Sequence, residues 1–138
     1  MMSLFNVFDV SGSALSAQSV RLNTVASNLA NADNVATTPE EVYKPRQPVF
    51  SAILDSMNPN QAAKGVRVDG VVESQADPLM KYDPGNPLAN EQGYVYSPDI
   101  STVEEMSNMI SASRSYQNNV EVMTTSKQLL MRTLQLGQ

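Results

Sequence analysis

The sequence contains no cysteine, histidine or tryptophan. The missing cysteine excludes a disulfide framework and a thiol nucleophile, and the missing histidine excludes a Cys/His zinc site and a histidine general base. Charge is also sparse, because charged residues make up 17% of the chain, below the ~25% usual for soluble domains. Any catalytic chemistry would have to use carboxylates, lysine, tyrosine or serine alone.

A basic excess and a long apolar run are missing as well. The 138 residues carry 14 acidic and 9 basic side chains, a balance that disfavours binding to a nucleic-acid backbone. No apolar run exceeds three residues, so the sequence predicts no membrane span. The first residues lack the basic and apolar parts of a cleaved secretory signal. We therefore expect a protein that stays in the cytoplasm or is exported without such a signal.

Proline divides the chain into three parts. All eight prolines lie between residues 39 and 98, which leaves both ends free to form long helices. We predict a mainly α protein with a small β element. Its parts are an N-terminal helix (1–36), a Pro/Gly-rich middle loop and β region (37–100) and a C-terminal helix (101–138).

Heptad spacing marks the N-terminal helix. The predicted seam residues are Phe8, Leu15, Leu22, Val25 and Leu29, four of which are seven residues apart. Ser3 is placed to cap the start of this helix, and the segment 31–34 supplies residues that tolerate a left-handed helix end.

The C-terminal helix is predicted from its start and end signals. Residues 101–104 form a capping-box pattern, and Gly137 stands where the helix should stop. Because an apolar seam needs a second seam to cover it, we predict that the two helices pair as an antiparallel coiled coil. The middle region would then be inserted at one tip. The seam on this helix is predicted to comprise Met106, Ile110, Val120, Met123, Leu130 and Leu134.

Short strands are predicted in the middle region. They cover 49–54, 66–69 with 71–72, and 94–96, and the segment 83–87 is a dense turn signal.

The outer face of the first helix predicts contact with other subunits. Between Val10 and Ala32 the only charge is Arg21, whereas a solvated helix face normally carries mixed charge. Small neutral side chains instead allow a second helix to approach closely. The alternative is an ordinary helical hairpin with a solvated outer face. The residues predicted at subunit interfaces are Ser19, Asn23, Asn28, Asn31, Arg114 and Tyr116.

Other polar groups give no site. Glu104 and Glu105 are explained by the electrostatics of a helix start. The oxygen-bearing residues Asp83, Asn86 and Glu91 do not have EF-hand spacing. We predict no catalytic, cofactor-binding or metal-binding residue. A small hydrolase that uses Asp69 and Glu73 is the alternative from a different functional class.

Four separated motifs resemble one protein family. They are SNLANAD at 27–33, YDPGNPLA at 82–89 followed by GYV at 93–95, EMSNMISASRSYQNN at 105–119 and LQLGQ at 134–138. Together with LFNVFD at 4–9, they resemble the bacterial flagellar basal-body rod and hook proteins, and most of all the short subunits of the proximal rod. The segment 33–48 departs from the family pattern.

The resemblance implies a structural role. Such proteins are exported unfolded by the flagellar type III apparatus without a cleaved signal, and they assemble into the rod that crosses the periplasm and transmits torque. The implied partners are other copies of the chain, other rod proteins, and the inner-membrane ring and export gate. Nucleic acid, small-molecule substrates and cofactors are not expected. Another axial subunit, or a needle-type subunit of a type III export machine, remains the alternative within this class.

Overall fold

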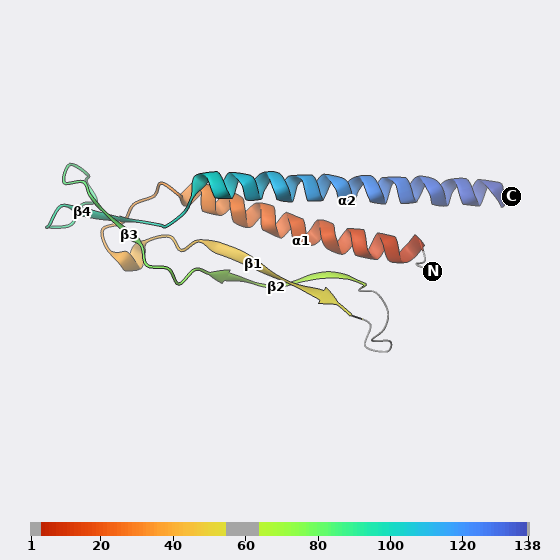
Figure 1. Ribbon diagram of the computed structural model, residues 1–138, viewed down its shortest axis with the longest axis horizontal. Coiled ribbons are helices and arrows are strands. Elements are labelled where there is room, and N and C mark those ends of the chain that lie inside the picture. The colour runs from red at the N-terminus through yellow and green to blue at the C-terminus, as the bar shows by residue number, and fades with distance from the viewer. Residues whose placement is uncertain (1–3, 55–63, 138) are drawn as a thin grey trace.

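The computed structural model describes residues 4–54 and 64–137 and is elongated (Figure 1). Its elements in chain order are α1 (Leu4–Asn31), a 3-10 helix η1 (Pro39–Glu41), β1 (Arg46–Ile53), β2 (Gly65–Glu73), β3 (Leu79–Tyr82), β4 (Tyr94–Ser97) and α2 (Thr102–Leu136). The predicted mainly helical fold with a small β part is confirmed. No helix among these residues is both long and apolar enough to cross a membrane.

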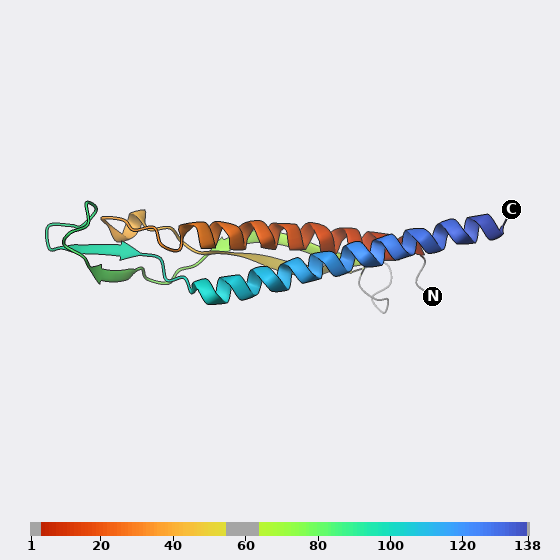
Figure 2. The same ribbon diagram turned by 90° about the horizontal axis from the view of Figure 1, so that it is seen from above.

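The two helices run antiparallel beside each other. Both chain ends lie at the same end of the molecule, where α2 extends past the start of α1 (Figures 1 and 2). The predicted cap of α2 is confirmed, since Ser101 Oγ accepts a hydrogen bond from the Glu104 N–H at 3.3 Å. Gly137 ends this helix as predicted. The predicted cap residue of α1, Ser3, lies outside the described residues.

The end of α1 differs from the prediction. The helix stops at Asn31, and no residue other than glycine has a positive φ in the described ranges 4–54 and 64–137. The predicted left-handed ending over 31–34 is therefore wrong. Backbone N–H groups of Ala32 and Asn34 instead donate to Leu29 and Asn31 carbonyls at 3.3 and 3.2 Å. These tight turns satisfy the last carbonyls without a left-handed residue.

Two antiparallel hairpins form the middle region. β1 pairs with β2, with a register shift between Val49 and Phe50, and β3 pairs with β4. The three predicted strands are confirmed as β1, β2 and β4, whereas β3 was not predicted. Only the β3–β4 hairpin lies at the tip. The β1–β2 hairpin runs back along α1, so that α1 lies between α2 and this hairpin (Figure 1).

Small side chains form the buried faces of the helices. Ala17, Val25 and Ala112 are 2%, 5% and 0% exposed, and Ser11 and Ser126 are also buried. Small residues let two helix backbones approach closely, so the packing uses less apolar bulk than the sequence pattern suggested. The described chain leaves many large apolar side chains on its surface, among them Leu79, Met80 and Tyr82 on β3.

The predicted seam residues divide between two environments. Val25 is buried, and half-buried positions are held by Phe8, Leu15, Leu22, Leu29, Met123 and Leu130. The remaining four point to solvent: Met106 (56% exposed), Ile110 (57%), Val120 (42%) and Leu134 (64%). Bulky apolar residues therefore mark a different face of α2 from the small residues, such as Ala112 and Ser126, that are buried in this chain.

Candidate subunit interface

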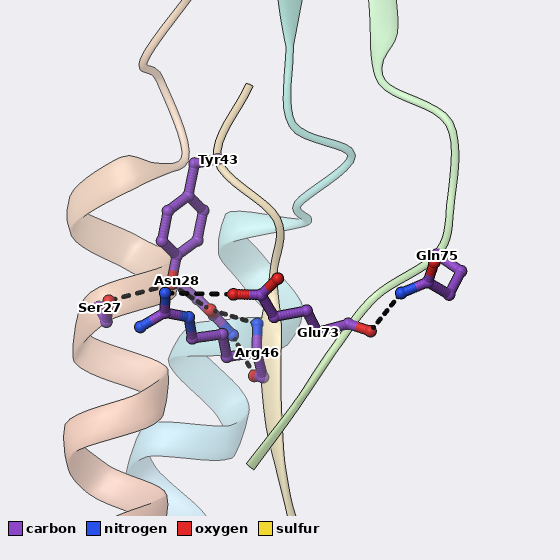
Figure 3. Close-up of polar contacts among 6 residues, drawn as sticks. All are labelled: Ser27, Asn28, Tyr43, Arg46, Glu73 and Gln75. Atoms are coloured by element: carbon purple, nitrogen blue, oxygen red, sulfur yellow. Dashed lines mark hydrogen bonds and ion pairs between the residues drawn. The ribbon is translucent and has the colours of Figure 1, made fainter. Parts of the chain in front are cut away.

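Asn28 is the polar centre that joins three elements. It is 2% exposed. Its Nδ2 donates to the Arg46 carbonyl at 2.9 Å and to Glu105 Oε2 at 3.0 Å, and its Oδ1 accepts from the Arg46 N–H at 2.9 Å. Tyr43 OH donates to the same Oδ1 at 2.9 Å (Figure 3). One side-chain amide of α1 thus pairs with Tyr43, with β1 and with α2 at once, and its buried donors and acceptor are satisfied.

The hydrogen bonds extend from Asn28 in two directions. Tyr43 OH lies 2.9 Å from Ser27 Oγ, which fixes the Tyr43 ring against α1 (Figure 3). On the other side, Glu105 Oε1 accepts from Asn108 Nδ2 at 3.3 Å, and Asn108 Oδ1 accepts from Arg21 Nη2 at 3.4 Å. We call the group formed by Ser27, Asn28, Tyr43, Arg46, Glu105 and Asn108 the asparagine hub.

The hub places two of the predicted interface residues. Asn28 was expected at a subunit interface; its side chain is buried, and its hydrogen bonds join elements of the same chain. The sequence favoured a surface position for this polar residue because its partners are 15 to 77 residues away in the chain. Asn31 is half-buried and bonds locally, because its Nδ2 donates to the Ser27 carbonyl at 2.8 Å.

A face of small residues is exposed along α1. Ser19 and Asn23, both predicted at an interface, lie on it. We define the small-residue face as Ser16, Ser19, Asn23, Ala26 and Ala30, all of which are exposed at spacings of three and four. The sequence prediction missed three of them, although the same spacing extends to them from Ser19.

A second heptad line runs along the exposed side of α2. Positions 106, 110, 117, 120, 124, 127, 131 and 134 are all exposed. With the half-buried position 113 included, their spacing follows the alternation of four and three in a coiled-coil seam. We define the outer stripe by the large apolar residues on this line: Met106, Ile110, Val120, Met131 and Leu134. Four of these were predicted as seam residues, and Met131 was missed.

The other predicted interface residues on α2 are not members of this line. Arg114 is exposed, and Tyr116 is 38% exposed. Arg114 lies to one side of the outer stripe, whereas Tyr116 is four residues before Val120 and borders the stripe.

The candidate hydrolase carboxylates are engaged in exposed ion pairs. Asp69 Oδ1 accepts from Arg67 Nε at 2.8 Å, and this hydrogen bond holds the pKa of Asp69 below its usual value. Glu73 Oε1 lies 3.2 Å from Arg46 Nη2 (Figure 3). Within the described ranges, Cys, His, Asp and Glu side chains form no cluster of three or more that could hold a metal ion.

Comparisons with known proteins agree with the four sequence motifs. Residues 8–36 match the family model described as flagella basal body rod protein, and residues 91–136 match the flagellar basal body rod FlgEFG protein C-terminal model. The chain is 53% identical over 137 residues to the flagellar basal-body rod protein FlgC of Salmonella typhimurium, covering 99% of this chain and 100% of that protein. The protein of the same name is 52% identical over 137 residues in Escherichia coli O157:H7, with 99% and 100% covered. It is 38% identical over 149 residues in Bacillus subtilis, with 99% of each chain covered.

Proposed function

Because this chain belongs to the flagellar basal-body rod protein family, as a FlgC-like structural subunit of the rod, we propose that it polymerises through the outer stripe of α2 and the small-residue face of α1. These two faces would extend the antiparallel helix pair into a multi-helix coiled coil. The family places the chain in the flagellar basal body, together with other basal-body components.

The outer stripe carries this proposal. Its five large apolar side chains are between 42% and 64% exposed on the described chain, more apolar surface than a solvated helix face normally presents. Their heptad spacing is the one that a helix needs to pack along a second helix. Ser16, Ala26 and Ala30 on the small-residue face have short side chains that leave space above the helix backbone. Large apolar side chains of a neighbouring subunit would fit such positions closely.

Torque transmission would follow from the connection between layers. The asparagine hub ties α1, α2 and β1 within one subunit through charge-assisted and neutral hydrogen bonds. A force applied to α2 by a neighbour would reach β1 through Glu105, Asn28 and Arg46. Many such subunits in parallel would carry shear, and no catalytic group is required for this role.

The finer statements on partners and route are part of the same proposal. Contacts would be made with other copies of the chain, with other rod proteins and with the inner-membrane ring and export gate. The rod would span the periplasm, and the chain would leave the cell interior through the flagellar export apparatus without a cleaved signal. A role as a hydrolase or as a needle-type subunit is not favoured by any observation above.

A glutamate on the outer stripe tests the proposal. Ile110→Glu should leave the antiparallel helix pair intact, because the side chain is 57% exposed, yet it should place a charge in each helix contact between subunits. We expect its incorporation into purified basal bodies to fall at least about tenfold. Ser111→Glu is the matched control, since Ser111 is exposed on the same helix but outside the stripe. Equal incorporation of both variants would refute the proposed contact.

A further inference from the structure

A cleft opens where the β3–β4 tip joins the rest of the molecule. It has a volume of about 290 Å³ and is bounded by η1 and the chain that follows it, by the segment 74–78 and by Pro98 with Asp99. The three chain segments that connect the tip to the helices and to the β1–β2 hairpin therefore form its walls. It lies at the opposite end of the molecule from the two termini (Figure 1).

The cleft combines apolar walls with an acidic rim. Proline rings and the Val42 side chain provide the apolar part, whereas Glu40, Asp77 and Asp99 provide negative charge against one cation, Lys44. In the described part of the chain these three carboxylates make no ion pair. We call this site the acidic cleft. The four proline residues that line it are Pro39, Pro45, Pro78 and Pro98.

The last turns of α2 have the complementary chemistry. This part of the helix extends past the start of α1 (Figures 1 and 2). Leu129 and Leu136 are 51% and 89% exposed, and with the exposed Arg132 they have spacings of three and four, which place them on one side of the helix. We call these three residues the end face. Residues 122–137 contain two basic residues and no acidic residue.

We propose that the end face of one copy docks into the acidic cleft of a second copy, head to tail. The two surfaces lie at opposite ends of one chain (Figure 1), so a single subunit cannot bring them together. A heterologous contact of this kind repeats from copy to copy, and it adds subunits in one direction when the rotation between copies does not close a ring. The inference rests on the proposed polymerisation, but it uses residues outside the outer stripe and the small-residue face.

Charge complementarity selects a second copy as the occupant. The chain is acidic overall, with a net charge of −5, so most contacts between copies would be repulsive at long range. The end face offers the opposite sign to the cleft. Leu136 can enter between proline rings while Arg132 reaches the carboxylates at the rim. Such pairing sets orientation as well as affinity, because the reversed arrangement would bring like charges together.

Charge reversal tests the pairing. Arg132→Glu should weaken head-to-tail association of the full-length chain at least about tenfold at low salt, measured by sedimentation. Asp77→Arg should weaken it likewise, and the double variant should recover most of the loss because the pair is restored with opposite polarity. Circular dichroism would verify that each variant keeps the helical content of the parent. Additive losses in the double variant would overturn the proposal.

Cysteine cross-linking tests the location directly, since the chain has no native cysteine. Leu136→Cys combined with Ala76→Cys should give a ladder of disulfide-linked oligomers in basal bodies, because Ala76 lines the cleft. Leu136→Cys combined with Gln92→Cys is the control, since Gln92 is exposed at the same tip but does not line the cleft. Equal ladders in both, or disulfide links only to a different rod protein, would overturn the proposal.

The two proposals can fail separately. If Ile110→Glu blocks incorporation while the charge reversals and the cysteine pair have no effect, polymerisation through the outer stripe stands and head-to-tail docking is wrong. If the cysteine ladder forms while Ile110→Glu incorporates normally, docking in the cleft stands and the outer stripe is not the contact.

Discussion

The side-chain amide of Asn28 pairs with both backbone polar groups of Arg46, accepting from its N–H and donating to its carbonyl at 2.9 Å each. Arg46 is the first residue of β1. Asn28 of α1 therefore makes the two hydrogen bonds to its backbone that a neighbouring strand would make in a sheet. The same Nδ2 also donates to Glu105 at 3.0 Å. One buried side chain therefore ties the start of the β1–β2 hairpin to both helices.

Asn28→Asp keeps the shape of this side chain and removes its donor. The Arg46 carbonyl would lose its partner, and a carboxylate would face the Glu105 carboxylate. We expect a loss of about 2–4 kcal/mol in the free energy of unfolding, measured by urea denaturation. Asn31→Asp is the control, because Asn31 is half-buried and bonds only within its own segment. A loss no larger than that of the control would show that the hub does not hold the hairpin.

The contact between the β1–β2 hairpin and α1 predicts a sharp difference between two glycines. A Cβ at Gly65 would lie 2.5 Å from Ser13 Oγ, the atom that accepts the Val66 N–H at 3.1 Å. Gly65→Ala should push the hairpin off α1 and cost about 1–3 kcal/mol. Gly70→Ala is in the same strand but has no atom within 4 Å of its Cβ, so it should change stability much less. Thermal unfolding of the two variants compares them, and equal midpoints would contradict the contact.

The helices were predictable because their signals are local. Proline positions, the Ser101 cap and Gly137 each act within a few residues, and the structure places α2 accordingly. The buried residues were harder, since Ala112 and Ser126 are small and carry little hydrophobic signal. β3 was missed because it has four residues, all exposed, and exists through pairing with β4.

The hub could not be predicted from periodicity, because the hydrogen bonds of Asn28 join residues 15 to 77 positions apart. A partial signal was present. Asn28 lies three residues after Val25 and four before Ala32, both of which are buried, and residues at these spacings share a helix face. The apolar type of these two neighbours indicates that Asn28 lies on the buried face of the helix, whereas the polar type of Asn28 itself indicates a surface position.

The ion pair on β2 predicts a pH effect of known sign. The Arg67 hydrogen bond lowers the pKa of Asp69 in the folded chain. The stabilisation is therefore present above the unfolded pKa and is lost as pH falls through the lower folded pKa. Arg67→Gln should raise the pKa of Asp69 towards its ordinary value, observed by carboxyl NMR titration. Arg46→Gln, which breaks the pair with Glu73 instead, should leave the Asp69 titration unchanged; an equal shift in both variants would rule out the direct pair as the cause.

The small-residue face of α1 is tested by adding charge to it. Ser19 and Asn23 are both exposed, so Ser19→Glu with Asn23→Glu should leave the helix pair able to form. In a polymer, the same charges would meet a neighbour at every subunit contact, where desolvation and repulsion add up. We expect bacteria that carry this double variant to export the chain but to lose motility. Their rods should also be less stable during detergent extraction.

The matched control places the same two charges elsewhere. Ser107→Glu with Ser111→Glu adds two glutamates four residues apart on exposed positions of α2 that lie outside the outer stripe. If this face of α1 is solvated, the two glutamates on α1 should change the free energy of unfolding as little as the two on α2, within about 0.5 kcal/mol. Bacteria that carry either variant would then swim alike. A defect confined to the Ser19 and Asn23 pair would instead mean that α1 is covered on this side by another subunit. The scarcity of charge on this helix would then be a requirement of packing between subunits, since a surface buried in every copy cannot carry unpaired charge.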